Sequence, residues 1–267
     1  MRQMLILNEV AKSFGANRAV DGVSAHIQRG AITGLIGPNG AGKTTLFNLL
    51  AGAMPLDVGS ITLDGQAIGG LRADQVFRAG LARTFQIPKP FLEMTVLENV
   101  MLAPRQQAGE SFWANWMSPQ RVVQQERLVR EKAMHWLKFV GLDALAGAAA
   151  RVLSGGQRKL LELARVMVAE PKIVLLDEPG AGVNPALLEV IVDRIRLLHE
   201  QGVTFLIIEH NMDLVASLCN PVMVMAQGKV LATGTPGEVL GDPRVLEAYL
   251  GDAPNPAQNV APALVTP

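Results

Sequence analysis

Residues 37–44 read Gly-Pro-Asn-Gly-Ala-Gly-Lys-Thr, and they join an apolar stretch at 31–36 to a helix predicted over Lys43–Leu50. A strand, a glycine-rich loop of this spacing and a helix, in that order, are the context in which such a loop binds phosphate. The alternative is a glycine-rich turn with a chance lysine, and the flanking strand and helix disfavour it. The segment therefore predicts an α/β fold with a phosphate site at the end of a strand.

The residue types in this loop suit a triphosphate. Successive backbone N–H groups that lead into a helix N-terminus meet negative charge with aligned dipoles. The glycines allow close approach, Lys43 supplies a positive charge for the outer phosphates, and the Thr44 hydroxyl is suited to Mg²⁺. The predicted nucleotide-binding residues of the loop are Gly37, Pro38, Asn39, Gly40, Ala41, Gly42, Lys43, Thr44 and Thr45.

A second apolar run, residues 173–176, ends in two carboxylates, Asp177 and Glu178. A buried strand can bring Asp177 to the metal and leave Glu178 facing the γ-phosphate, where it would polarise the attacking water. Taken alone, two acids after an apolar strand are more often a solvated strand end. Together with the loop at 37–44 they predict a hydrolytic site for a nucleoside triphosphate.

Composition sets the broad class. The chain has 267 residues, of which 49% are hydrophobic, so a substantial core is expected. Its 24 basic residues balance its 24 acidic ones, so no overall positive field attracts nucleic acid or an anionic membrane. The single cysteine, Cys219, has no partner for a disulfide, and neither a secretory signal nor a membrane-spanning run is evident. We expect a cytoplasmic location, with membrane attachment only through a partner.

Strand and helix signals alternate along the chain. Strand-like segments at 5–10, 24–28, 31–36 and 61–63 precede others at 81–85, 173–176 and 203–208. This order predicts a mostly parallel core sheet with crossover helices. Strand signals fade after residue 87, where apolar residues recur at helical spacing, so we predict an inserted helical subdomain over about 87–160. Residues 1–251 would form one domain, and 252–267, rich in proline, a tail without fixed structure.

A third motif makes a family resemblance specific. Leu153-Ser154-Gly155-Gly156-Gln157 lies about 16 residues before the second apolar run, and a serine followed by two glycines suits a helix start that meets an anion. In this order and spacing the motifs resemble those of ABC-transporter ATPases. The resemblance implies their α/β fold, with a parallel core sheet, an antiparallel β subdomain and a helical subdomain. It also implies that Ser154, Gly155, Gly156 and Gln157 contact ATP held by a second ATPase subunit.

The same resemblance assigns roles to further residues. Gln86 matches the glutamine that contacts Mg²⁺ or the attacking water, and His210 the histidine that hydrogen-bonds the γ-phosphate. The implied catalytic residues are then Glu178, His210 and Gln86, with Thr44, Gln86 and Asp177 at the metal. Phe14 is placed to stack on the adenine, and Val20 to add an apolar contact, for which plain packing is an equal alternative. Many relatives have Asp where this chain has Asn184, which removes an acid from the loop after Glu178.

Five further segments resemble the ATPase subunits of branched-chain amino acid importers. They are residues 82–86, 94–100, 180–185 and the stretches at 234–236 and 248–251. The resemblance implies transmembrane permease subunits, a second ATPase subunit, identical or not, and an external solute-binding protein that acts indirectly. Urea or short-amide import and lipopolysaccharide export are the alternatives from nearby branches. Residues 86–90 and 91–94 are expected to contact the permease, and Trp113 and Trp116 either do so as well or pack locally.

Two different classes compete with a transport ATPase. A nucleic-acid-associated ABC ATPase would be expected to carry a long coiled coil or a second cassette, and the balanced charge also disfavours it. A regulatory module that binds ATP without hydrolysis would not need Glu178 and His210. We therefore expect a transport ATPase with ATP and Mg²⁺ as cofactors and no nucleic-acid partner.

Overall fold

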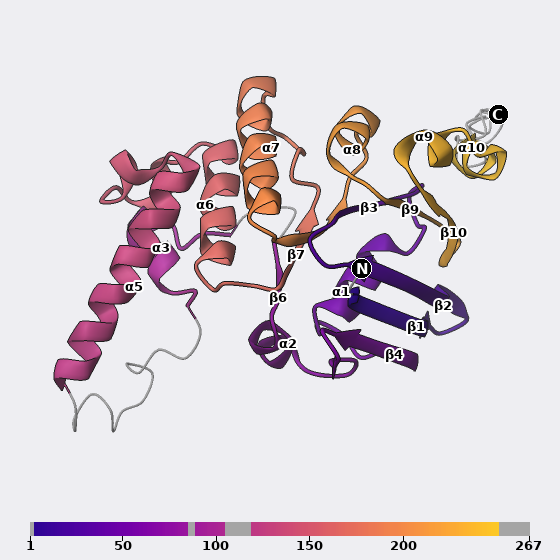
Figure 1. The fold of residues 1–267 in the computed structure, drawn as a ribbon, viewed down its shortest axis with the longest axis horizontal. Coiled ribbons are helices and arrows are strands. Elements are labelled where there is room, and N and C mark those ends of the chain that lie inside the picture. The colour runs from indigo at the N-terminus through magenta and orange to yellow at the C-terminus, as the bar shows by residue number, and fades with distance from the viewer. Residues whose placement is uncertain (1–2, 85–88, 105–118, 251–267) are drawn as a thin grey trace, which may run out of the picture.

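A computed structural model describes residues 3–84, 89–104 and 119–250, with side chains from residue 123 onward in the last range. Its centre is a six-stranded sheet in the order β10-β9-β3-β8-β7-β6 (Figure 1). The strands are β3 (Ile32–Ile36), β6 (Leu81–Arg83), β7 (Ile173–Asp177), β8 (Thr204–Ile208), β9 (Val222–Ala226) and β10 (Lys229–Gly234). All neighbours pair in parallel except the edge strand β10, which is antiparallel to β9.

The central strands are apolar throughout because both faces of the sheet are covered. In β7, Ile173 and Leu175 belong to one core cluster, whereas Val174 and Leu176 belong to the other. Neighbouring β8 alternates in the same way, and all five of its residues are buried. This two-sided burial holds the carboxyl ends of the strands rigidly, which is where the chemistry was predicted.

A second sheet of four antiparallel strands, ordered β2-β1-β4-β5, covers one face (Figure 1). Its strands are β1 (Gln3–Phe14), β2 (Asn17–Gln28), β4 (Val58–Leu63) and β5 (Gln66–Ala67). Apolar side chains of this sheet share a core cluster with helix α1 (Lys43–Leu50) and with one face of the central sheet. The antiparallel sheet therefore packs over the helix that follows the phosphate loop.

Of the remaining helices, α2 (Ala73–Ala79) shares the core cluster of the antiparallel sheet through Val76, and the rest cover the other face or form the helical end at the left of Figure 1. Helices α3 (Val96–Met101), α5 (Pro119–Val140) and α6 (Gly155–Met167) pack on one another at that end. Short 3-10 turns at Asp143–Leu145 and Ala150–Val152 join α5 to α6. The others are α7 (Pro185–Glu200), α8 (Met212–Leu218), α9 (Pro236–Leu240) and α10 (Pro243–Leu250).

The predicted fold class is confirmed: a mostly parallel core sheet, an antiparallel sheet and a group of helices inserted between β6 and β7. The sequence reading missed the hairpin of β9 and β10, whose turn at Gln227 and Gly228 has positive φ at both residues. The boundaries proposed for the helical subdomain, 87–160, stay a prediction. The predicted tail, 252–267, lies outside the described residues, as do Trp113 and Trp116.

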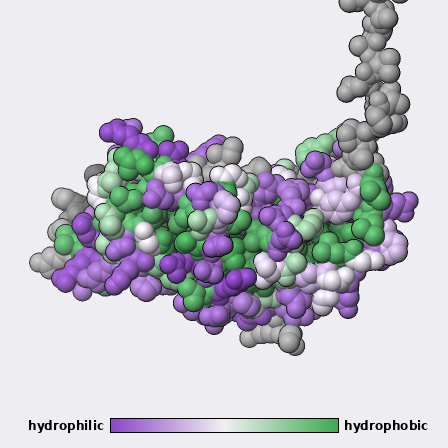
Figure 2. Space-filling model, turned by 90° about the horizontal axis from the view of Figure 1, so that it is seen from above, coloured by the Kyte–Doolittle hydropathy of each residue, from purple (hydrophilic) through white to green (hydrophobic). Residues whose placement is uncertain are grey.

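The outer surface mixes apolar and charged side chains (Figure 2). Large exposed apolar residues include Phe91, Leu92 and Val152 beside the helical end, and Leu246 and Leu250 on α10. Within the described ranges, each helix is too short or too polar to traverse a lipid bilayer.

Candidate functional site

The loop between β3 and α1 is built around glycines that a side chain could not replace. A Cβ at Gly37 would lie 2.0 Å from the Met225 carbonyl oxygen, and one at Gly42 would lie 2.2 Å from the Ala19 carbonyl oxygen. Both residues also have positive φ, at 148° and 97°. The loop is therefore pressed against β9 on one side and β2 on the other, and only glycine permits both contacts.

The N-terminus of α1 is suited to an anion. Gly42 is its N-cap in a left-handed conformation, no side chain caps the helix, and no acidic residue lies in its first turn. Lys43 is a buried residue, and its ammonium donates hydrogen bonds to the carbonyl oxygens of Gly37 (2.7 Å) and Pro38 (2.8 Å). The lysine thus already lies across the loop, and a bound phosphate would be a stronger acceptor than these carbonyls.

The loop forms one wall of an open cleft of about 630 Å³. Most of the predicted site residues line this cleft, although they come from separate segments of the chain. They are Phe14, Asn39, Gly40, Ala41, Gly42, Lys43, Thr44, Thr45, Glu178 and His210. Pro38 faces the adjoining hollow beside α10 instead, together with Asn39. Phe14 is 52% exposed, so its ring is available for stacking on a ligand.

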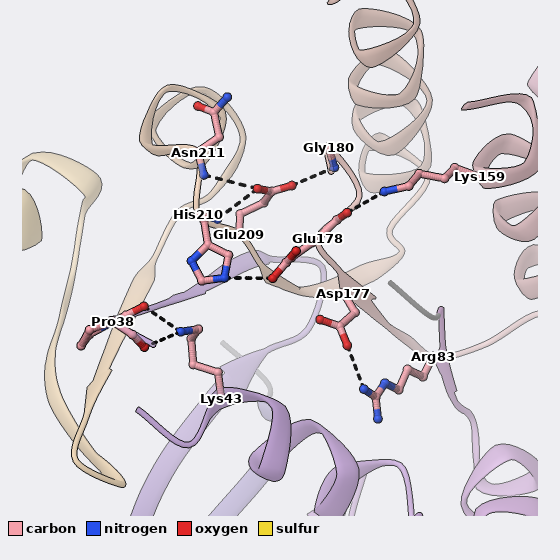
Figure 3. Close-up of polar contacts among 11 residues, drawn as sticks. Pro38, Lys43, Arg83, Lys159, Asp177, Glu178, Gly180, Glu209, His210 and Asn211 are labelled. Carbon is pink, nitrogen blue, oxygen red and sulfur yellow. Dashed lines mark hydrogen bonds and ion pairs between the residues drawn. The ribbon is translucent and has the colours of Figure 1, made fainter. Parts of the chain in front are cut away.

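Glu178 and His210 meet across the cleft (Figure 3). The His210 Nε2 atom lies 2.9 Å from a Glu178 carboxylate oxygen. Glu178 follows β7 and His210 follows β8, and because these parallel strands are neighbours their ends deliver both side chains to one place. Glu178 has φ of +48°, which is unfavourable for a non-glycine residue and is often found at functional sites.

Asp177 points to a different neighbour. Its carboxylate accepts a hydrogen bond from the Arg83 guanidinium at 2.8 Å, and Arg83 also donates to the Asn48 amide oxygen at 2.5 Å. The Arg83 guanidinium carbon lies 5.7 Å from the centre of the Phe47 ring. Asn48 stands one turn beyond Thr44 on α1, so Arg83 brings Asp177 close to the face of the helix that carries the predicted metal ligand Thr44.

Besides Arg83, two more charged residues of the site were not found from the sequence. Glu209 is buried, and its carboxylate accepts hydrogen bonds from the backbone N–H groups of Gly180, His210 and Asn211. Lys159, on α6, donates to the carbonyl oxygens of Glu178 (2.8 Å) and Pro179 (3.2 Å) (Figure 3). Glu209 binds Gly180, and Lys159 binds Glu178 and Pro179, across a long separation in the sequence, which no sequence pattern reports. The available signal was an acid placed between an apolar strand and His210.

The signature segment 153–157 caps α6. The Ser154 hydroxyl accepts from the Gln157 N–H at 3.3 Å, and the Gln157 side chain accepts in return from the Ser154 N–H at 3.0 Å. Ser154 and Gly155 are exposed, and neither lines the cleft of their own chain. Ser154 and Gly155 are thus accessible to a molecule outside this chain, whereas Gly156 is buried.

One predicted contact is corrected and one stays a prediction. Val20 is fully buried in the core beneath the antiparallel sheet, so it cannot contact a base in the cleft; its strand neighbour Ala19 lines the cleft instead. The alternation of side chains along a strand explains the error of one residue. Gln86 lies outside the described residues, so its roles in catalysis and at the metal stay predictions.

A phosphate loop after parallel strand β3, a carboxylate strand two places along the same sheet and an outward-facing signature helix together define an ABC-type ATPase. The chain belongs to the ABC transporter family, because the model of that family matches residues 20–181. A second model, described as branched-chain amino acid ATP-binding cassette transporter, matches residues 229–254.

Three similar relatives are named for one kind of transport. A probable branched-chain amino acid transport ATP-binding protein LivG of Archaeoglobus fulgidus is 40% identical over 93% of this chain and 96% of its own length. The high-affinity branched-chain amino acid transport ATP-binding protein BraF of Pseudomonas aeruginosa is 40% identical over 94% and 99%. LivG of Escherichia coli is 38% identical over 94% and 98%.

Solved structures agree in fold. A nucleotide-free ATP-binding cassette from an ABC transporter has a TM-score of 0.81 and 37% identity over 93% of this chain and 99% of its own. A cassette in its ADP conformation has a TM-score of 0.79 and 36% identity over 94% and 100%.

Proposed function

We propose that this chain is the ATP-hydrolysing subunit of an importer of branched-chain amino acids. The observation that carries its ATPase role is the cleft, which brings Lys43, Glu178 and His210 together from three strand ends. The solute is supported by the names of the relatives and by the family model at 229–254. We expect the solute to contact the other subunits and not this chain, so those subunits determine which solute is carried.

The cleft residues divide the work of phosphoryl transfer to water. The loop N–H groups and Lys43 bind the phosphates, and Phe14 stacks on the base. Glu178 orients and polarises the attacking water, and His210 contacts the γ-phosphate. In the structure Glu178 and His210 are paired with each other, so binding of ATP would replace this contact by contacts to water and phosphate.

The donor set near α1 fits Mg²⁺. This ion prefers hard oxygen ligands and is usually held by one or two protein groups together with phosphates and water. Thr44 offers a hydroxyl in the cleft, and Asp177 offers a carboxylate that Arg83 holds near the same helix. When bound, Mg²⁺ neutralises charge that develops on the phosphates. Arg83 keeps a counter-charge on Asp177 before the ion arrives.

The site is completed by a second ATPase subunit. Ser154 and Gly155 are exposed at the positively polarised start of α6, away from the cleft of their own chain, which suits contact with a nucleotide held by another chain. We assign to the pair of ATPase subunits a place on the cytoplasmic face of the membrane, beneath transmembrane permease subunits. An external solute-binding protein would deliver the substrate to those permeases.

Replacing Glu178 by Gln tests the hydrolytic role. The amide keeps the shape of the side chain and its ability to hydrogen-bond, but it cannot polarise water as a carboxylate does. We expect ATP to bind normally while steady-state release of phosphate falls at least a hundredfold. Lys43→Ala is the matched control for binding, since it should lower the affinity for a fluorescent ATP analogue at least tenfold. Normal turnover by the Glu178→Gln protein would refute the assignment.

The solute is tested by purifying the chain from membranes with its partners and placing the complex in vesicles. Uptake of labelled leucine that requires ATP and is lost with Glu178→Gln is the expected result. Uptake of urea but not leucine, or outward movement of lipopolysaccharide, would replace branched-chain amino acids by the corresponding alternative.

A further inference from the structure

The backbone at Glu178 is held in a conformation that it would not adopt by itself. Its φ of +48° is in the left-handed region, where the Cβ of an L-residue other than glycine meets steric conflict. Such a conformation persists only when the surrounding structure over-determines it. Since this backbone aims the carboxylate that faces His210, the groups that hold it control the geometry of the hydrolytic site.

Several contacts hold the turn that begins at Glu178. The Glu178 N–H donates to the Ile208 carbonyl at 3.0 Å, and the Ala181 N–H donates to the Glu178 carbonyl at 3.1 Å. Glu209 accepts from the Gly180 N–H at 2.8 Å. Gly180 suits this contact, because a Cβ there would lie 3.0 Å from the same carboxylate oxygen. These contacts tie the turn to the loop after β8.

Lys159 connects the same turn to a different part of the molecule. It lies on α6, four residues beyond Gly155, and its ammonium reaches the Glu178 carbonyl at 2.8 Å and the Pro179 carbonyl at 3.2 Å (Figure 3). The side chain is partly buried. Burial lowers the pKa of the Lys159 ammonium, while the charges of Glu209, Glu162, Glu178 and Asp177 oppose that shift. Backbone carbonyl oxygens and the surrounding carboxylates thus stabilise the Lys159 ammonium at a position that is partly shielded from solvent.

We propose that Lys159 is a positioning residue, which fixes the backbone of Glu178 and links the signature helix to the hydrolytic carboxylate of the same chain. This inference rests on the proposed role of Glu178. Because α6 is a continuous helix from Gly155 to Met167, a nucleotide that contacts its N-terminus would shift Lys159 together with Gly155. The two carbonyls that Lys159 binds would then move with it, so the turn at Glu178 would respond to ATP held by the other subunit.

The test compares Lys159→Met with Lys159→Arg in the full chain, assembled with its partner subunits. Met has a similar length but no donor, so it should lower kcat at least tenfold and change KM for ATP by less than twofold. Arg restores donors for both carbonyls, and a cavity of about 30 Å³ that Lys159 lines beside Pro179 offers space for the larger group. We expect Lys159→Arg to keep at least half of the wild-type kcat.

Two controls separate this role from general damage to the fold. Lys132→Met removes a lysine of the helical end whose ammonium contacts Glu170 at the surface, and it should change neither kcat nor KM. Adding Lys159→Met to the Glu178→Gln protein should lower its residual turnover by less than twofold, because a residue that acts through Glu178 has little effect once that carboxylate is gone. Retained affinity of Lys159→Met for a fluorescent ATP analogue shows that the protein is folded.

The inference is overturned if Lys159→Met turns over within twofold of wild type, if Lys159→Arg is as slow as Lys159→Met, or if the loss appears in KM instead of kcat. A full tenfold loss in the Glu178→Gln background would also overturn it. These outcomes differ from failure of the proposed function, which would appear as normal hydrolysis by the Glu178→Gln protein itself.

Discussion

Gly155 and Gly156 are adjacent in the signature segment, yet a methyl group would meet different surroundings at the two positions. At Gly156 a Cβ would lie 2.0 Å from Cδ2 of Leu187, on α7, so this glycine allows α6 and α7 to approach closely. At Gly155 nothing lies within 4 Å of the added atom. Packing within the chain therefore explains why residue 156 is a glycine, whereas Gly155 has space around it for a partner.

This difference predicts that alanine substitutions at the two positions will differ in their effect on stability. Gly156→Ala should lower the free energy of unfolding by about 1–3 kcal/mol through overpacking. Gly155→Ala should change it by less than about 0.5 kcal/mol, as at other uncrowded positions. Denaturant unfolding of the two proteins measures both values. Equal stability of both variants would show that Leu187 moves aside without cost.

Cys219 gives a second prediction for a single residue. It is 3% exposed, and burial, with a smaller contribution from Glu209, raises the pKa of its thiol to about 12. In the unfolded chain the thiol ionises near pH 8.5. The folded state therefore favours the protonated form, and its stability falls as the pH rises from about 8.5 towards 12. When the pH is raised from 7.5 to 9.5, the free energy of unfolding of wild type should fall by about 1 kcal/mol more than that of Cys219→Ala, which has no thiol to ionise.

A labelling experiment checks the same burial. Because Cys219 is the one cysteine of the chain, a thiol reagent at pH 8 should react only after denaturant is added. Rapid labelling of the native protein would contradict the high pKa.

At the scale of elements, the loop after β7 ends at the residue that caps the N-terminus of α7. Asn184 is the N-cap of α7, and its side-chain oxygen accepts from the Leu187 N–H at 2.9 Å, with Pro185 in the first turn. Asn184, where the family resemblance leads us to expect an aspartate, thus has a local structural role. An aspartate would cap the helix equally well and would add a favourable charge at its N-terminus.

Asn184→Ala should therefore lower the free energy of unfolding by about 1 kcal/mol, whereas Asn184→Asp should leave it within about 0.5 kcal/mol. Thermal unfolding of both variants against wild type tests the cap. A comparable loss in the aspartate variant would mean that the side-chain amide has a further partner.

At the scale of the whole molecule, the cleft proposed to bind ATP and the exposed residues Ser154 and Gly155 are separate surfaces of one chain. The cleft is lined by residues of the central and antiparallel sheets and their loops, whereas Ser154 and Gly155 begin a helix that packs on α5 at the helical end. This separation is what a site shared between two subunits requires, because each chain then supplies one half to its partner.

Gly155→Arg in the Glu178→Gln background tests that arrangement. In size-exclusion chromatography with ATP and Mg²⁺, we expect the Glu178→Gln protein to elute as a dimer of ATPase subunits. The double variant should elute as a monomer, because the arginine blocks the surface at Ser154 and Gly155. Its affinity for a fluorescent ATP analogue should remain within twofold. A parallel loss of affinity in the isolated double variant would show that the signature acts within its own chain.

Local pattern by itself determined the phosphate loop, the helix Lys43–Leu50, the carboxylate strand and the family, because these features depend on spacing and on bonds between residues close in sequence. Tertiary structure decided which partners those residues meet. Arg83 and Asp177 are joined from 94 positions apart, Lys159 reaches carbonyl oxygens on another element, and Val20 is turned into the core although its neighbour lines the cleft. Such contacts depend on how sheets and helices pack, and packing is set by the whole chain rather than by any segment of it.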